Sequence, residues 1–175
     1  MMYSFKDKLK ESQSAEWRRR WDAVYRHYWP QVERIEEVHS LALQQVGVDV
    51  QVRRGALPLV RVEEKSTSKV RDTMFIELWS QWYGDGHRRN RPGWSVRDDM
   101  LTDYLAYGWA DRCLLIPWQA YRNGVDAGLP LWRQTRRLIS VKNRNYETLG
   151  IWVERQELLK RCIDAMHVRF DEVVL

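Results

Sequence analysis

The residues best suited to chemistry in this chain lie in a predicted β-hairpin over residues 47–67. Valine alternates with polar residues over positions 48–53, and this period of two is typical of half-buried strands. Over positions 60–65, Val60, Val62 and Glu64 alternate in the same way with Arg61, Glu63 and Lys65. Gly55 and Pro58 supply a turn between the two strands. The pattern therefore predicts a hairpin with one apolar face and one charged face.

The length of the turn predicts which charged residues face one another. With a loop over residues 54–58, Gln51 pairs with Arg61. Two residues further on, Asp49 lies opposite Glu63, with the Cβ atoms about 5 Å apart. Carboxylates this close repel each other and raise one of the two pKa values, unless a positive group such as a divalent cation lies between them.

Lys65 lies two residues beyond Glu63 on the same face, and this set of residues suits metal-assisted hydrolysis of a phosphodiester. Carboxylate oxygens are hard ligands for Mg²⁺, and we expect Mn²⁺ to substitute for it. The metal would polarise a phosphoryl oxygen and lower the pKa of a bound water, while the ammonium would orient that water or stabilise the developing charge. We expect Asp49, Glu63 and Lys65 to be catalytic, with the two acids as metal ligands.

This spacing resembles that of the PD-(D/E)XK nuclease superfamily, in which an acid on one strand is followed by an acid-x-Lys triplet on the next strand. Asp49 matches the first position, and Glu63 and Lys65 match the triplet. Val48 stands where the proline of the motif would be. The competing interpretation is an ordinary amphipathic hairpin whose charged face is solvated.

The resemblance implies an α/β protein with a restriction-endonuclease-like αβββαβ core, in which helices flank a mixed sheet. It also implies that the backbone carbonyl of Glu64 is a metal ligand. Family members often add an acid from the helix before the hairpin, and Glu36 is the residue of this chain that we expect in that role.

The elements predicted around the hairpin follow the order that such a core requires. One domain is expected over residues 1–175, with a core at about 30–120 and a C-terminal elaboration at about 121–175. Helices are predicted at residues 14–28, 30–46, 95–108, 118–123 and 154–170, and further strands at 73–80, 112–116, 138–141 and 149–153.

A basic loop over residues 87–94 is the strongest sign of a nucleic-acid partner. The chain has 29 Lys and Arg against 24 Asp and Glu, a net charge of +5, and most of the basic residues are arginines, which suit a polyanion. Within the loop, Arg88, Arg89 and Arg91 are expected to contact phosphates, and Trp94 to stack on a base. A coding bias towards arginine explains the composition alone equally well.

We therefore expect a Mg²⁺-dependent nuclease that hydrolyses DNA. The sequence leaves open whether RNA is also a substrate, whether the enzyme is an endonuclease or an exonuclease, and whether it forms a homodimer. The alternatives are a catalytically silent nucleic-acid-binding or regulatory protein on a nuclease fold, and a protein-interaction module. The longest apolar run, at residues 113–118, is too short to span a bilayer, so no membrane partner and a cytoplasmic location are expected.

Overall fold

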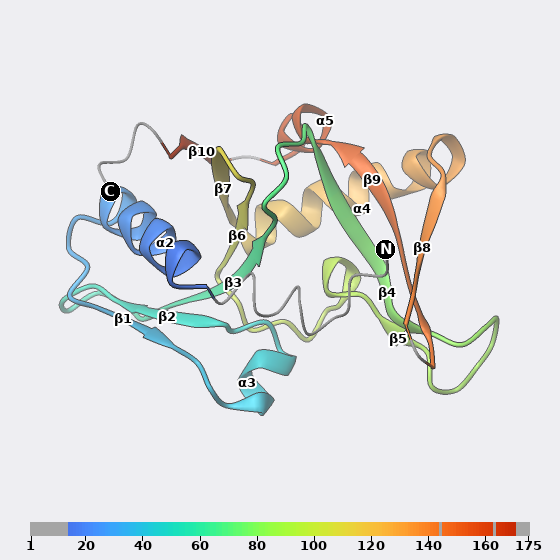
Figure 1. The fold of residues 1–175 in the computed structure, drawn as a ribbon, viewed down its shortest axis with the longest axis horizontal. Helices are drawn as coiled ribbons and strands as arrows, with labels where there is room; N and C mark the ends of the chain where they lie inside the picture. The colour runs from blue at the N-terminus through green and yellow to red at the C-terminus, as the bar shows by residue number, and fades with distance from the viewer. Residues whose placement is uncertain (1–13, 144, 163, 171–175) are drawn as a thin grey trace. The chain divides into compact units, whose positions relative to one another are not determined.

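The computed structural model describes residues 14–143, 145–162 and 164–170, which belong to two compact units of the chain (Figure 1). The first unit contains the described residues up to Val70, Leu101–Trp118 and those from Ala165 onward. The second unit contains Arg71–Met100 and Gln119–Asp164. The chain thus leaves the first unit twice and returns to it. The expectation of one domain over residues 1–175, with a core at about 30–120, stays a prediction.

The first unit is built on a six-stranded mixed sheet. Its strands lie in the order β1-β2-β3-β6-β7-β10. Neighbouring strands are antiparallel except β3 and β6, which are parallel. The strands are β1 (Arg34–Glu37), β2 (Val50–Arg53), β3 (Val60–Ser66), β6 (Tyr104–Gly108), β7 (Arg112–Pro117) and β10 (Met166–Arg169). With the helices described below, this sheet confirms an α/β protein with a mixed sheet.

Helix α2 (Ala15–Tyr28) covers one face of this sheet (Figure 1). The side chain of Ser14 caps its first turn by accepting a hydrogen bond from the Trp17 N–H at 3.3 Å. Trp17, Trp21 and Tyr25 recur at intervals of four residues, so they form a buried stripe on one side of the helix. The stripe packs on the apolar faces of β2 and β3, and Gly108 in β6 leaves room for the Trp17 ring, which would lie 2.6 Å from an added Cβ.

The predicted hairpin is present with the predicted register. In β2 and β3, Val50 pairs with Val62 and Gln51 pairs with Arg61. The valines point into the core under α2, where Val62 is fully buried. Since side chains alternate along a strand, Arg61, Glu63 and Lys65 of β3 are turned to the opposite face of the sheet.

Two helices predicted for the first unit are wrong. Residues 30–46 contain the edge strand β1 and the short helix α3 (Leu41–Gln45), because backbone hydrogen bonds to β2 take up the first half of the segment. Residues 95–108 end in β6, which lies between β3 and β7. Leu105 and Ala106 are both fully buried, on opposite faces of this central strand, so its apolar residues are consecutive and resemble a helical pattern.

The second unit has a four-stranded antiparallel sheet in the order β5-β4-β9-β8. Its strands are β4 (Thr73–Trp82), β5 (Arg91–Pro92), β8 (Leu138–Lys142) and β9 (Glu147–Glu154). The unit also contains the 3₁₀ helix η1 (Trp94–Val96), α5 (Arg155–Leu159) and, from Gln119 on, α4 (Trp118–Thr135). No helix among the described residues is long and apolar enough to cross a membrane.

Three further predictions are corrected by these elements. The strand predicted at residues 73–80 exists as β4, but it belongs to the second sheet and does not extend the hairpin of the first. The helix predicted at residues 118–123 continues to Thr135. The helix predicted at residues 154–170 is replaced by α5 and by β10, which pairs with β7 in the first sheet.

Truncation of Val62 should destabilise the first unit. The side chain is fully buried between α2 and the sheet, so Val62→Ala should lower the free energy of unfolding by roughly 1–3 kcal/mol in a denaturant titration. Val70 is the matched control, because its side chain is 65% exposed and the same substitution should change the value by less than about 0.5 kcal/mol. Equal effects at the two positions would contradict this packing.

Candidate functional site

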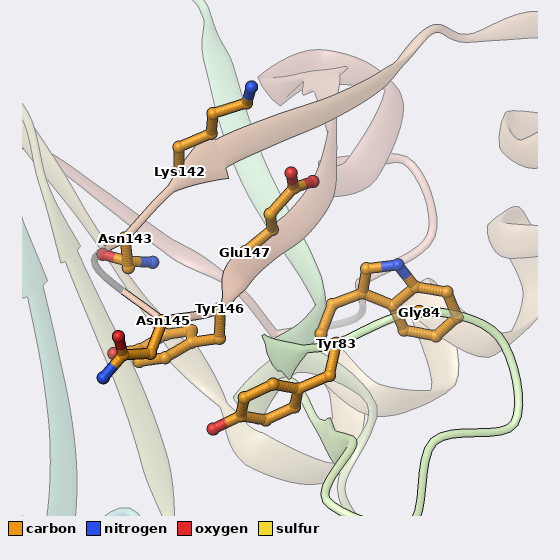
Figure 2. A pocket seen from close by; sticks show the side chains of 8 residues that line it. Tyr83, Gly84, Lys142, Asn143, Asn145, Tyr146 and Glu147 are labelled. Atoms are coloured by element: carbon orange, nitrogen blue, oxygen red, sulfur yellow. The ribbon is translucent and has the colours of Figure 1, made fainter.

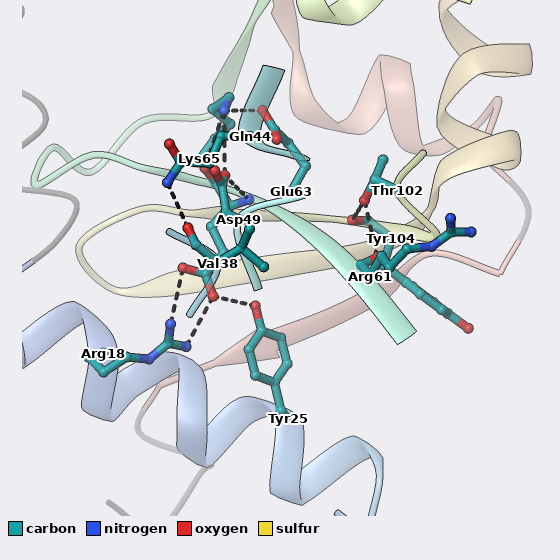
Figure 3. Close-up of polar contacts among 11 residues, drawn as sticks. Arg18, Tyr25, Val38, Gln44, Asp49, Arg61, Glu63, Lys65, Thr102 and Tyr104 are labelled. Atoms are coloured by element: carbon teal, nitrogen blue, oxygen red, sulfur yellow. Dashed lines mark hydrogen bonds and ion pairs between the residues drawn. The ribbon is translucent and has the colours of Figure 1, made fainter. Parts of the chain in front are cut away.

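The first unit brings Asp49, Glu63 and Lys65 together on one face of its sheet (Figure 3). The Asp49 N–H donates to the Val62 carbonyl at 2.9 Å, which continues the pairing of β2 with β3. Asp49 Oδ2 accepts a hydrogen bond from the Glu64 N–H at 2.9 Å, so the carboxylate is held against β3. Lys65 Nζ forms an ion pair with Glu63 Oε1 and lies 3.9 Å from Asp49 Oδ2. We call these three side chains the acid–lysine cluster.

Glu63 is the buried member of the acid–lysine cluster, with 4% of the residue exposed. Its pKa is raised to about 7, chiefly because burial disfavours the charged form; the Lys65 ammonium opposes this rise and Asp49 adds to it. Among the described residues, Oε2 of this carboxyl is buried without a hydrogen-bond partner. Lys65 thus binds one oxygen of the Glu63 carboxyl, and a proton or a second cation could bind the other.

The oxygen atoms of the acid–lysine cluster fit the implied Mg²⁺ site in number and type. Mg²⁺ commonly takes one or two carboxylates and keeps several waters. Asp49 and Glu63 supply the carboxylates, and the Glu64 carbonyl, to which Lys65 Nζ donates at 3.3 Å, lies beside them. No three His, Cys, Asp or Glu side chains among the described residues are grouped to hold a metal. The candidate Mg²⁺ site thus consists of two carboxylates and one backbone carbonyl.

Glu64 points to the other face of β3, where α2 covers it. Its carboxylate accepts a hydrogen bond from the Tyr25 hydroxyl at 2.7 Å and from Arg18 Nη2 at 3.0 Å. Burial raises the pKa of Glu64 to about 7, while Arg18 and Tyr25 oppose that rise and Asp49 adds to it. This network ties α2 to the strand that carries Glu63 and Lys65.

The partners of Glu64 were not found by sequence reasoning, although a signal was present. Glu64 takes the place of an apolar residue in the alternation that begins at Val60 and Val62. Arg18 and Tyr25 are seven residues apart, which puts them on one side of a helix. An acid on an apolar face needs a polar partner from the element that covers it.

Arg61 lies on the same face as Glu63 but is engaged elsewhere. Its guanidinium binds both oxygens of Asp103, at 3.1 and 2.9 Å, and Asp103 Oδ2 also accepts from the Arg61 N–H at 2.8 Å. Such a bidentate pair holds the arginine in place. It links β3 to the segment that leads into β6.

Glu36 lies in β1 and not in a helix. It pairs across the sheet with Gln51, and its carboxylate forms ion pairs with Arg34 at 2.9 Å and Arg53 at 3.5 Å. No hydrogen bond or ion pair among the described residues joins it to the acid–lysine cluster. The expectation that a helix supplies this acid is wrong, and its role as a metal ligand stays a prediction.

The predicted nucleic-acid contacts lie in the second unit. Arg88 and Arg89 are exposed in the loop between β4 and β5, and Arg91 is exposed in β5. The loop is held by Asn90, whose side chain accepts from the Tyr83 N–H at 2.9 Å and donates to the Gly84 carbonyl at 2.7 Å. The arginines are therefore presented to solvent by an ordered turn.

Trp94 packs against another aromatic side chain of the second unit. It begins η1, and its ring stacks on that of Tyr121 with centroids 5.6 Å apart and an angle of 14° between the planes. Tyr121 is fully buried, and its hydroxyl donates to Ser95 Oγ at 2.9 Å. One face of the Trp94 ring thus packs in the protein, and its contact with a base stays a prediction.

The pH dependence of stability should report the burial of Glu64. An acid whose pKa is higher in the folded protein takes up a proton on folding, so stability should fall as the pH rises from about 4.5, the usual value, to about 7. With a chelator present, Glu64→Gln should reduce this decrease in the free energy of unfolding by on the order of 1 kcal/mol or more. Denaturant unfolding at a series of pH values measures it. Identical curves for the two proteins would contradict the assignment.

Tyr25→Phe is the matched variant for that measurement. Loss of the hydroxyl removes a hydrogen bond that lowers the pKa of Glu64, so the fall in stability should extend to higher pH. The two substitutions therefore move the same curve in opposite directions. A general loss of packing would not produce this pattern.

No protein-family model matches the sequence, and no curated protein or solved structure matches the chain. The function is therefore inferred from the residues of the chain and their geometry.

Proposed function

We propose that the chain is a Mg²⁺-dependent nuclease with a restriction-endonuclease-like core, and that it hydrolyses DNA phosphodiester bonds. The observation that carries the proposal is the acid–lysine cluster, in which a buried acid and its neighbour share one lysine on the polar face of a sheet. Such a set of side chains can hold a divalent cation and stabilise negative charge in one place.

The order of elements in the first unit supports this proposal. Helix α2 precedes three antiparallel strands, β1, β2 and β3, and β6 lies parallel to β3, an arrangement compatible with an αβββαβ core. These are not the elements predicted for that core, because β1 and β6 stand where helices were predicted and β4 belongs to the second sheet. One feature departs from that pattern. The crossover from β3 to β6 runs through the second unit and includes β4, β5 and η1 in place of a single helix.

Each side chain has a distinct part in the proposed reaction. Asp49, Glu63 and the Glu64 carbonyl would hold Mg²⁺, which when bound polarises a phosphoryl oxygen and activates water. The Glu64 N–H fixes the orientation of Asp49. Lys65, with a third of its side chain exposed, can turn its ammonium from the acids towards the phosphate and stabilise the charge that develops there.

A second candidate is a catalytically silent nucleic-acid-binding protein with the same core. The observation that favours it is the position of Lys65, whose ammonium contacts Glu63 and the Glu64 carbonyl and lies near Asp49. An ammonium there offsets the charge of the acids as a metal would. The two candidates differ in whether Mg²⁺ binds at these oxygens.

Substitution of either acid should abolish cleavage. Asp49→Asn and Glu63→Gln preserve shape but remove the charges that hold the metal, so the rate of DNA cleavage in Mg²⁺ should fall by about 100-fold or more, and Mn²⁺ should support cleavage by the wild type. Glu33→Gln is the matched control, because this acid of the first unit is exposed and lies outside the acid–lysine cluster, and the variant should keep near-normal cleavage. Cleavage by the wild type in chelator, or by either acid variant at the normal rate, would refute the proposal.

Lys65→Met separates the two candidate functions. It keeps most of the apolar stem but removes the ammonium, so catalysis should fall by about 100-fold or more with little change in DNA affinity. If the acids bind Mg²⁺, the cation should raise the melting temperature of this variant, because it replaces the lost positive charge. The control is Lys69→Met, because Lys69 is exposed. It should change neither the rate of catalysis nor the effect of Mg²⁺ on the melting temperature.

The silent candidate predicts a different result for the same variants. Mg²⁺ would then leave the melting temperatures of the wild type and of Lys65→Met unchanged, and the wild type would bind DNA without cleaving it. An equal fall in affinity and rate in Lys65→Met would instead make the lysine a simple phosphate contact.

A further inference from the structure

We propose that the second unit binds an unpaired nucleotide of a single-stranded nucleic acid in a pocket between the end of β4 and the β8–β9 hairpin. The choice of ligand class rests on the proposed function, but the site is separate from the acid–lysine cluster. The pocket has a volume of about 450 Å³, within the range of small-ligand sites.

The pocket is built where three strands end. Trp82 in β4 pairs with Glu147 in β9, which in turn pairs with Lys142 in β8, so these three residues form one row across the sheet. Beyond the row, the Asn143 N–H donates to the Tyr146 carbonyl at 2.8 Å and closes the hairpin. The walls of the pocket therefore come from paired strands and from residues on either side of the bond that closes the hairpin.

Aromatic rings line one end of the pocket (Figure 2). The centroids of the Tyr83 and Tyr146 rings are 6.1 Å apart, with 50° between their planes. Both residues are half-buried and line the pocket. His87 stacks on Tyr83 at 5.0 Å. Rings held in this way can stack on a base, whereas paired bases in a duplex are already stacked on one another.

Polar groups of the pocket match the edge of a base. Asn145 lies next to Tyr146 in the chain and lines the pocket, and it is exposed, so its amide can reach a bound base (Figure 2). The Glu147 carboxylate accepts from Ser140 Oγ at 2.5 Å and keeps further acceptor capacity. An amide and a carboxylate together can bind both donors and acceptors on a base.

Positive charge around the pocket favours a phosphate backbone over a neutral ligand. Lys142 lines the pocket and is exposed, and the exposed Arg88 and Arg89 directly follow His87, whose ring stacks on Tyr83 of the pocket. Aromatic rings with amides would also suit an oligosaccharide, but three exposed cations suit a polyanion better. This is the reason for assigning a nucleotide to the pocket.

The test is binding of labelled oligothymidine, oligouridine and a duplex of equal length, measured by fluorescence anisotropy in chelator. The wild type should bind single strands more tightly than the duplex, and the two single strands distinguish DNA from RNA. Tyr83→Leu and Tyr146→Leu should each weaken binding about tenfold or more, whereas Tyr83→Phe and Tyr146→Phe, which keep the rings, should stay within about threefold.

Two further sets of variants guard against loss of folding and against purely electrostatic binding. Asn145→Ala and Lys142→Gln change exposed side chains, and each should weaken single-strand binding severalfold with an unchanged melting temperature. Replacement of Arg88 and Arg89 by Gln should flatten the dependence of log affinity on log salt, by about 0.7 for each lost phosphate contact. The ring variants should leave that slope unchanged.

The pocket would be rejected if the wild type bound no single strand, or if it bound only an uncharged oligosaccharide. It would also be rejected if the duplex bound as tightly as the single strands and the variants weakened both equally. Unchanged single-strand binding by the leucine, Asn145 and Lys142 variants would reject it as well. The proposed nuclease activity fails separately. Asp49→Asn should bind oligothymidine as the wild type does, because the pocket is separate from the acid–lysine cluster. If the wild type binds oligothymidine but cleaves no DNA in any divalent cation, the nuclease is rejected and the pocket is kept.

Discussion

The register of β2 against β3 is the constraint on which the rest of the first unit depends. Val50 pairs with Val62 because both side chains are buried under α2. A shift of the pairing by one residue would turn every side chain of one strand to the other face. It would bury charges under the tryptophans of α2 and expose the valines. The burial of a few valines thus holds Asp49 beside Glu63.

Two consecutive acids in β3 illustrate how the same residue type takes on different parts. Glu64 faces α2, where Arg18 and Tyr25 bind both of its oxygens and tie the helix to the sheet. Glu63 faces the opposite way and has one lysine, with one oxygen left without a partner among the described residues. The fully bound acid stabilises the fold, and the partly bound acid is suited to take up a cation or a proton.

Local pattern was sufficient for the hairpin, for α2 and for the presence of most strands, but not for the sheet to which each strand belongs. β4 has the same alternation as β2 and β3, yet it pairs with β9 in the second unit. β6 lies between two strands, so it is apolar on both faces and its residues fit a helical spacing equally well. Strand pairing between distant segments decided both cases.

For the candidate site, the sequence by itself determined the acid–lysine cluster, because the turn length and the alternation of valines set the distance between Asp49 and Glu63. Only the tertiary structure decided the environment of the acids. The partners of Glu64 lie 39 and 46 positions away in the chain, and the pocket of the second unit combines β4 with a hairpin more distant still. Burial and pKa depend on such long-range contacts, and residue spacing within one segment does not contain them.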